Sequence, residues 1–146
     1  MPIALILALL VGVGALFFSA TRPPPPLVVA IAPIPNQTGD PAYDPLALAV
    51  TDLVATQVAG VEGVQVLRGD GARVDARIGG RLVLWNRQAS LSFSAEDPAS
   101  GTVLWSAMAA GPAGALPRQI DAAVANFGTY VAARRDGRVD KGGAGP

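Results

Sequence analysis

Residues 76–108 read ARIGGRLVLWNRQASLSFSAEDPASGTVLWSAM, and this stretch decides the class of fold. In its middle, apolar and polar residues alternate from Ala89 to Glu96, with the period of two that is typical of a strand with one buried and one solvated face. Strands of the same kind flank it, and the two connections, 85–88 and 97–101, contain turn-forming residues. The stretch therefore predicts a three-stranded antiparallel meander.

The segments on either side supply the remaining elements of one α+β domain. Residues 27–32 form a continuous apolar run rich in β-branched side chains, which predicts a strand buried on both faces. Residues 44–59 and 116–135 carry apolar side chains at helical spacing, and 64–67 is a short apolar strand. We expect Asp44 to cap the first helix. The order strand, helix, strand, meander, helix predicts a mixed β-sheet with both helices packed on one face.

The N-terminus carries a different signal. Residues 3–20 are eighteen residues without a charge, and at ~1.5 Å per residue a helix of this length crosses most of a bilayer core of ~30 Å. We interpret residues 1–20 as a transmembrane signal anchor. The alternative is a cleaved signal peptide, although Phe18 is large for the −3 position of a cleavage site after Ala20. Residues 21–26 contain four prolines and predict a semi-rigid linker.

The expected organisation is therefore an α+β domain over 27–135, preceded by one transmembrane helix and followed by a disordered tail over 136–146. The basic side chain that flanks the apolar segment is Arg22, on its C-terminal side. Taken alone, the positive-inside rule would leave the domain in the cytoplasm. One arginine leaves the orientation open.

The composition excludes several classes of chemistry. The 146 residues include no Cys and no His, which removes disulfides, thiolate catalysis and the Ser-His-Asp triad. Lys and Arg number 11 and Asp and Glu also number 11, so the chain lacks the basic field that binds nucleic acid. We expect no catalytic residues, no metal, no cofactor and no nucleic-acid partner.

Two residues are candidates for contact with a partner. Trp85 and Arg87 lie at the predicted turn 85–88, and an exposed aromatic beside a cation is a common anchor at protein interfaces. Asp40 and Asp44 would suit a divalent ion only with further oxygen ligands, and roles in a turn and a helix cap explain both residues.

Other polar groups have simpler structural explanations. Asn36-Gln37-Thr38 matches a glycosylation sequon, but an Asx-type turn explains it better. One stretch of mixed charge is expected to be solvated and not to form an anion site; its charged residues are Arg68, Asp70, Arg73, Asp75, Arg77 and Arg81. The solvated face of a strand is expected to carry Ser90, Ser92 and Ser94.

Two groups of residues resemble the TolB amino-terminal-like domain family. The first is the strand and loop 29–41, VAIAPIPNQTGDP, and the second is an Asp-x-x-x-Gly turn that precedes Leu-Trp. The motif positions are Asn36, Thr38, Gly39, Asp40, Asp97, Gly101 and Trp105. The sequence departs from the family at Ile34, where the family usually has an aromatic residue, and at 68–74, which is too short for one helix of the family fold.

The resemblance, which spans about 28–127, implies a periplasmic or membrane-tethered accessory domain and no catalytic set. On that basis we expect a single-pass inner-membrane protein that contacts the membrane through residues 3–20, with its C-terminal domain in the periplasm. Its partner would be an envelope or inner-membrane protein, or a second copy in a homo-oligomer. The alternative is a periplasmic small-ligand sensor domain of a transport or signalling system, which needs converging polar groups in an apolar cleft.

Overall fold

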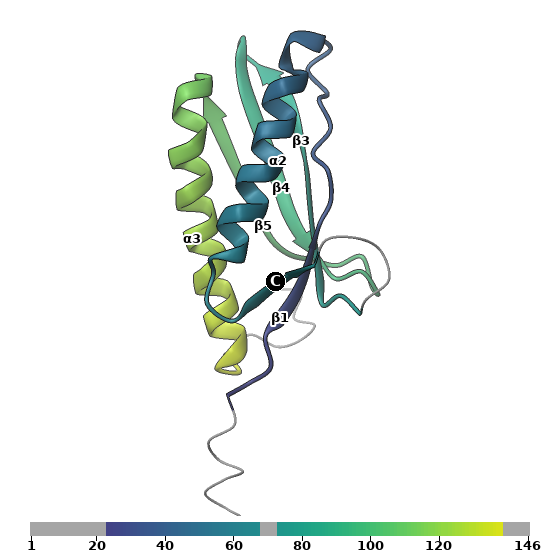
Figure 1. The fold of residues 1–146 in the computed structure, drawn as a ribbon, viewed down its shortest axis with the longest axis vertical. Coiled ribbons are helices and arrows are strands. Elements are labelled where there is room, and N and C mark those ends of the chain that lie inside the picture. Colours follow the sequence, from purple (N-terminus) through teal and green to yellow (C-terminus); the bar gives the residue numbers. More distant parts are fainter. Residues whose placement is uncertain (1–22, 68–72, 139–146) are drawn as a thin grey trace, which may run out of the picture.

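The computed structural model describes residues 23–67 and 73–138 (Figure 1). Its elements follow the predicted order, with two short 3-10 helices, η1 and η2, added before the two α-helices. They are β1 (Leu27–Ile31), η1 (Pro41–Tyr43), α2 (Asp44–Ala59), β2 (Val64–Leu67), β3 (Ala76–Trp85), β4 (Gln88–Glu96), β5 (Val103–Gly111), η2 (Ala113–Ala115) and α3 (Leu116–Arg135).

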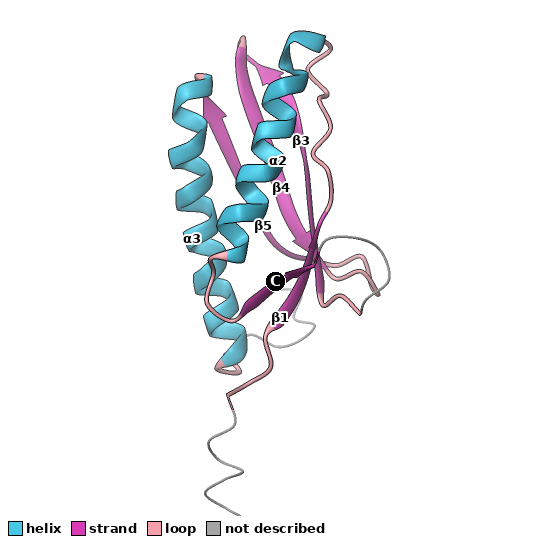
Figure 2. Cartoon of the chain, viewed as in Figure 1, coloured by secondary structure: helices cyan, strands magenta, loops and turns pink. Residues whose placement is uncertain are grey.

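The five strands form one mixed sheet in the order β2-β1-β3-β4-β5. Strand β1 runs parallel to both β2 and β3, whereas β3, β4 and β5 are the predicted antiparallel meander. Figure 2 shows α2 and α3 side by side in front of the same face of the sheet. The predicted α+β architecture is confirmed.

The core lies between the helices and this inner face of the sheet. Cross-strand pairing aligns alternate residues of neighbouring strands on it, for example Ile78 with Ala95 and Leu82 with Leu91. The fully buried residues of largest volume are Phe127, Ile78, Leu82, Leu91, Leu116, Ile120, Val29, Val54, Val58 and Val131. The apolar stripes predicted for both helices therefore face the sheet.

Strand β1 is buried on one face only, so the prediction of two buried faces is wrong. Leu27 and Val29 are buried, whereas Val28 and Ala30 on the opposite face are partly exposed. The reason is that both helices pack on one side, so even an interior strand of this sheet keeps one face open (Figure 2). A continuous apolar run does not distinguish these two environments.

Three residues of the meander differ in burial from what strict alternation would give. Leu84, on the same face of β3 as Ile78 and Leu82, is 37% exposed because it sits next to the β3–β4 turn. Val103 is 56% exposed, since an irregularity in the pairing at Ala95/Glu96 places it opposite the exposed Glu96. Ser90, expected on a wet face, is buried between its cross-strand neighbours.

The helix ends differ in detail from expectation. Tyr43 is the N-cap of α2, and Asp44 is its first residue and accepts a hydrogen bond from Asn36 instead. At the other end of the domain, Asp136 and Arg138 donate backbone hydrogen bonds to α3, with Gly137 at φ 70°. These residues, which we assigned to the tail, close the helix.

Within residues 23–67 and 73–138, no helix has the length and apolar character needed to span a membrane. The anchor predicted for residues 1–20 lies outside the described residues, as do Arg68, Asp70 and most of the predicted tail.

Gly80 has a specific steric role that allows a test of this packing. A Cβ atom there would lie 2.8 Å from Phe93 Cβ and would also clash with the Ser92 carbonyl oxygen, whereas a Cβ at Gly79 would approach nothing closer than 3.8 Å. We expect Gly80→Ala to lower the free energy of unfolding by about 1–3 kcal/mol, and Gly79→Ala to leave it nearly unchanged. Chemical denaturation of both variants checks this, and equal stability of the two would contradict the pairing of β3 with β4.

Candidate functional site

The tip of the β3–β4 hairpin presents both residues predicted to contact a partner. Trp85 is 73% exposed and Arg87 is exposed. The turn residues Asn86 and Arg87 have φ values of 50° and 63°, as a type I′ turn requires. Asparagine tolerates this left-handed conformation, but for arginine it costs roughly 1 kcal/mol. The structure thus brings Trp85 and Arg87 to one exposed tip.

The outer face of the sheet, opposite the helices, is the larger surface adjoining this tip. No helix of the described part of the chain covers it (Figure 2). Its central residues have small side chains or none: Gly79, Ser92, Ser94, Ser106 and Ala110. Four of them, Gly79, Ser92, Ser94 and Ser106, form the floor of a shallow depression of about 680 Å³ with Arg81 and Met108 among its walls. Met108 is 70% exposed.

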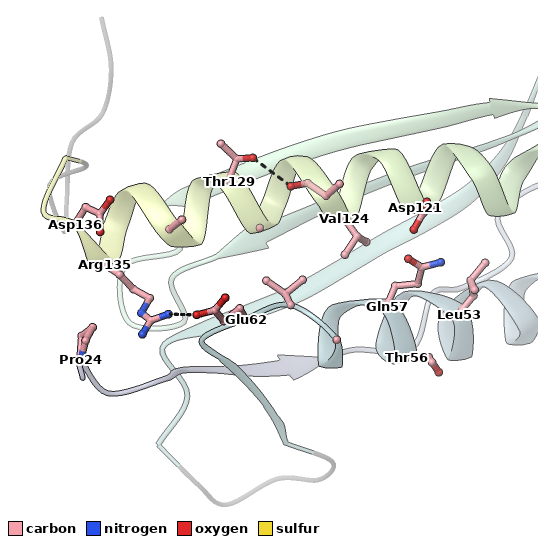
Figure 3. Close-up of a pocket in the computed structure, with 15 residues that line it drawn as sticks. Pro24, Leu53, Thr56, Gln57, Glu62, Asp121, Val124, Thr129, Arg135 and Asp136 are labelled. Carbon is pink, nitrogen blue, oxygen red and sulfur yellow. Dashed lines mark hydrogen bonds and ion pairs between the residues drawn. The ribbon is translucent and has the colours of Figure 1, made fainter. Parts of the chain in front are cut away.

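A groove of about 1050 Å³ lies between α2 and α3 (Figure 3). Arg135 and Glu62, 4.0 Å apart, lie at one end of it, and Gln57 and Asp121 lie at the other. The Thr129 hydroxyl donates to its own helix. The polar groups are therefore spread along the groove, whereas a small-molecule site needs them to converge.

The loop that carries the first TolB-like motif is organised by Asn36. Its Oδ1 accepts hydrogen bonds from the backbone N–H and the hydroxyl of Thr38, at 2.9 and 2.6 Å, and its Nδ2 donates to the Asp40 carbonyl and to Asp44. The Asp40 side chain accepts from the Ala42 N–H, and Gly39 adopts φ 81°. The expected Asx turn is present, and both aspartates are engaged in loop hydrogen bonds.

The second motif forms the β4–β5 turn. Asp97 and Gly101 are joined by a backbone hydrogen bond of 2.7 Å, and Gly101 has φ 69°. Trp105 is 8% exposed, as expected for the core, and its indole N–H donates to Asn126 of α3. These motif residues have structural roles in the described chain.

Among the described residues there is no group of three acidic, His or Cys side chains that would hold a metal ion. Arg73, Asp75 and Arg77 are exposed, and Asp75 accepts a hydrogen bond from the Val28 N–H. The described residues present the uncovered outer face of the sheet and, beside it, the exposed tip with Trp85.

No protein-family model matches the chain, and no curated protein matches it. Among solved structures, the domain resembles the PelC dodecamer from Paraburkholderia phytofirmans, with 17% identity, a TM-score of 0.53, and coverage of 71% of this chain and 91% of that one. A variant of that dodecamer gives 18% identity, a TM-score of 0.51, and coverage of 76% and 94%. TolB from Acinetobacter baumannii matches with 12% identity and a TM-score of 0.45 over 79% of this chain and 29% of that one.

The PelC similarity shows a shared fold, and the TolB similarity is too low to carry an argument. The α+β fold that the TolB-like motifs implied is present, while membership of that family stays a prediction. The sequence predicts that Trp85 lies at an exposed turn, as it does, but it does not indicate the exposure of Met108 or the uncovered outer face. Alternation within a strand indicates that one of its faces is solvated. It does not show that the solvated faces of all five strands form one surface that no helix covers.

Asp97 provides a test of the β4–β5 turn. Hydrogen bonds from the backbone of Ala99, then from Ser100, and the charge of Arg134 hold the pKa of the Asp97 carboxyl below its ordinary value of 3.8. A lowered pKa in the folded state means that the carboxylate stabilises the fold above pH 3.8, and that this contribution is lost as the pH falls through the folded-state value.

We therefore expect Asp97→Asn to be less stable than the parent protein at pH 7, with the difference disappearing in strong acid. Thermal unfolding of both proteins across this pH range measures the difference. A gap of constant size at all pH values would show that the carboxylate charge is not what stabilises the turn.

Proposed function

We propose that this chain is a non-enzymatic, membrane-anchored accessory protein of the cell envelope, which binds a partner protein through the outer face of its sheet and the Trp85 tip. The observation that carries the proposal is an uncovered sheet face with small residues at its centre, which exposes the large apolar side chains of Trp85 and Met108 beside the charged Arg81 and Glu96. Aromatic residues, methionine and arginine are enriched in protein interfaces, and Arg81 and Arg87 are exposed on the same face and tip.

Backbone strain at the Trp85 tip also supports a role for the tip in binding a partner. Arg87 occupies a left-handed conformation that a glycine or asparagine would adopt with less strain. Such strain is found at functional sites more often than elsewhere. An arginine at this turn position would supply charge and hydrogen-bond donors to a partner at the expense of some hairpin stability.

The placement of the tip suits a tethered protein. The described chain begins at Pro23, at the end of the molecule opposite the hairpin tip (Figure 1). Strand β3 alone has 10 residues, which span roughly 30 Å at about 3.4 Å per residue. If residues 3–20 anchor the chain, the Trp85 tip points away from the bilayer, and the anchor raises the local concentration of the domain for envelope partners.

PelC, with the same fold, is a dodecamer, which supports self-association as one form of this binding role. The sensor alternative would use the groove between α2 and α3. The separation of its polar groups disfavours it. We further propose an inner-membrane location with the domain in the periplasm, on the basis of residues 3–20 and the TolB-like motifs.

Site-specific photocrosslinking in the native host tests the proposed face. A benzoylphenylalanine in place of Met108 is expected to give a discrete adduct with another protein, and one in place of Leu48 on α2 is expected to give none. The two positions are a matched pair, since they are 70% and 71% exposed. Trp85→Ala should lower the yield at position 108 several-fold.

Adducts of equal yield at both positions, or none at position 108, would contradict binding through the outer face. Circular dichroism of the Trp85→Ala protein controls for folding, and we expect little change because the side chain is exposed.

A further inference from the structure

Strand β5 is an edge of the sheet with unusual composition for that position. Its nine residues, Val103–Gly111, include no charged residue and no proline, although such residues are the usual protection of an edge against pairing with another chain. The opposite edge, β2, has four residues. Strand β5 is therefore the edge that is better suited to pairing with a strand of another chain.

The free backbone groups of this edge are identified by a hydrogen bond at its end. The Ala110 N–H donates to the Gln119 side chain of α3, 2.7 Å away, and so points away from β4. Because backbone groups alternate in direction along a regular strand, those of Ser106 and Met108 also point away from β4. Strand β5 is an edge of the sheet, so no strand of the described chain pairs with these two groups.

We infer that β5 pairs antiparallel with β5 of a second copy of this chain, about a two-fold axis at Ser106, to form a continuous ten-stranded sheet. The inference goes beyond the proposed function, because it rests on the β5 edge and not on the outer face, and because it specifies how a second copy would bind. In this register, Ser106 lies opposite Ser106 of the second copy, and Leu104 lies opposite Met108. The strand is thus complementary to itself, with small polar residues at the axis and apolar pairs on both sides.

Other registers would require groups that are already in use. An axis at Ala107 or Met108 would require the Ala110 N–H, which is bonded to Gln119. An axis at Leu104 or Trp105 would pair a residue of the second copy with Thr102, whose carbonyl accepts the Asp97 N–H in the β4–β5 turn. An axis at Ser106 requires neither group.

A second copy paired in this register would also bring its α3 near α3 of the first. Gln119 and Asn126, which bond to β5 residues, mark the side of α3 that faces this edge. Ala122 and Ala133 flank that side of the helix. A two-fold axis perpendicular to the sheet would set the two α3 helices side by side, and these short side chains allow a close approach.

A continuous sheet makes a geometric prediction that cysteine substitution tests, since the chain has no cysteine of its own. Opposed residues of a hydrogen-bonded antiparallel pair have Cα atoms about 5.5 Å apart, within the roughly 4.4–6.8 Å that a disulfide spans. We expect the full chain with Ser106→Cys, purified in detergent, to form a disulfide dimer on the order of tenfold faster than controls under mild oxidation.

Two controls separate pairing in this register from random collision. Met108→Cys lies on the same strand, and its copies would be about 14 Å apart along the strand direction, at about 3.4 Å per residue, so it should react slowly. Leu48→Cys on α2 has the same exposure as Met108 and reports collision within the micelle. A mixture of Leu104→Cys and Met108→Cys chains should give the mixed dimer faster than either chain gives its own.

The inference is overturned if Ser106→Cys forms dimers no faster than Leu48→Cys, or if Met108→Cys reacts fastest, which would indicate another register. An adduct of Ser106→Cys with another protein in place of its own dimer would also overturn it. Circular dichroism of each variant verifies folding. Because the assay uses this chain alone, its outcome is independent of the photocrosslinking with a partner.

Discussion

The packing of α3 against a single face of the sheet, through Phe127, is the interaction on which the rest of the structure depends. Phe127 is fully buried, and its ring centroid lies 5.1 Å from Trp105 and 6.1 Å from Tyr130, while Trp105 contacts Phe93 at 5.4 Å. This aromatic row joins β4, β5 and the helix. Together with the valines of α2 it buries the inner face, and aromatic pairs of this kind contribute about 0.5–1.5 kcal/mol beyond the area they bury.

A two-layer domain built in this way has one sheet face left over. On that face the chain leaves glycine, serine and alanine at the centre, and exposes Trp85 and Met108 beside charged residues such as Arg81 and Glu96. A flat floor with a few large apolar side chains favours contact with another protein surface, because it offers area without a deep cleft. The same arrangement leaves β5 as an unprotected edge.

The chemistry of the chain is consistent with a binding role. Polar residues that appeared as candidate sites in the sequence, such as Asn36, Asp40 and Asp97, are engaged in turns. In the groove between the helices, Arg135 and Glu62 form an ion pair at one end, and Asp121 lies toward the other end (Figure 3). Binding through shape and apolar contact needs no cluster of titratable groups, and a sequence without His and Cys has few means of building one.

By itself, the sequence determined the elements, their order and the class of fold, because periodicity, turn residues and the apolar stripes at Leu116–Val131 are local signals. It also determined the absence of imidazole and thiol chemistry. Only the tertiary structure decided that β1 has one open face, that Gly80 must lack a side chain beneath Phe93, and that β5 rather than the meander's first strand is an edge. These properties depend on which strands become neighbours, and pairing between distant segments leaves no periodic signal in either segment.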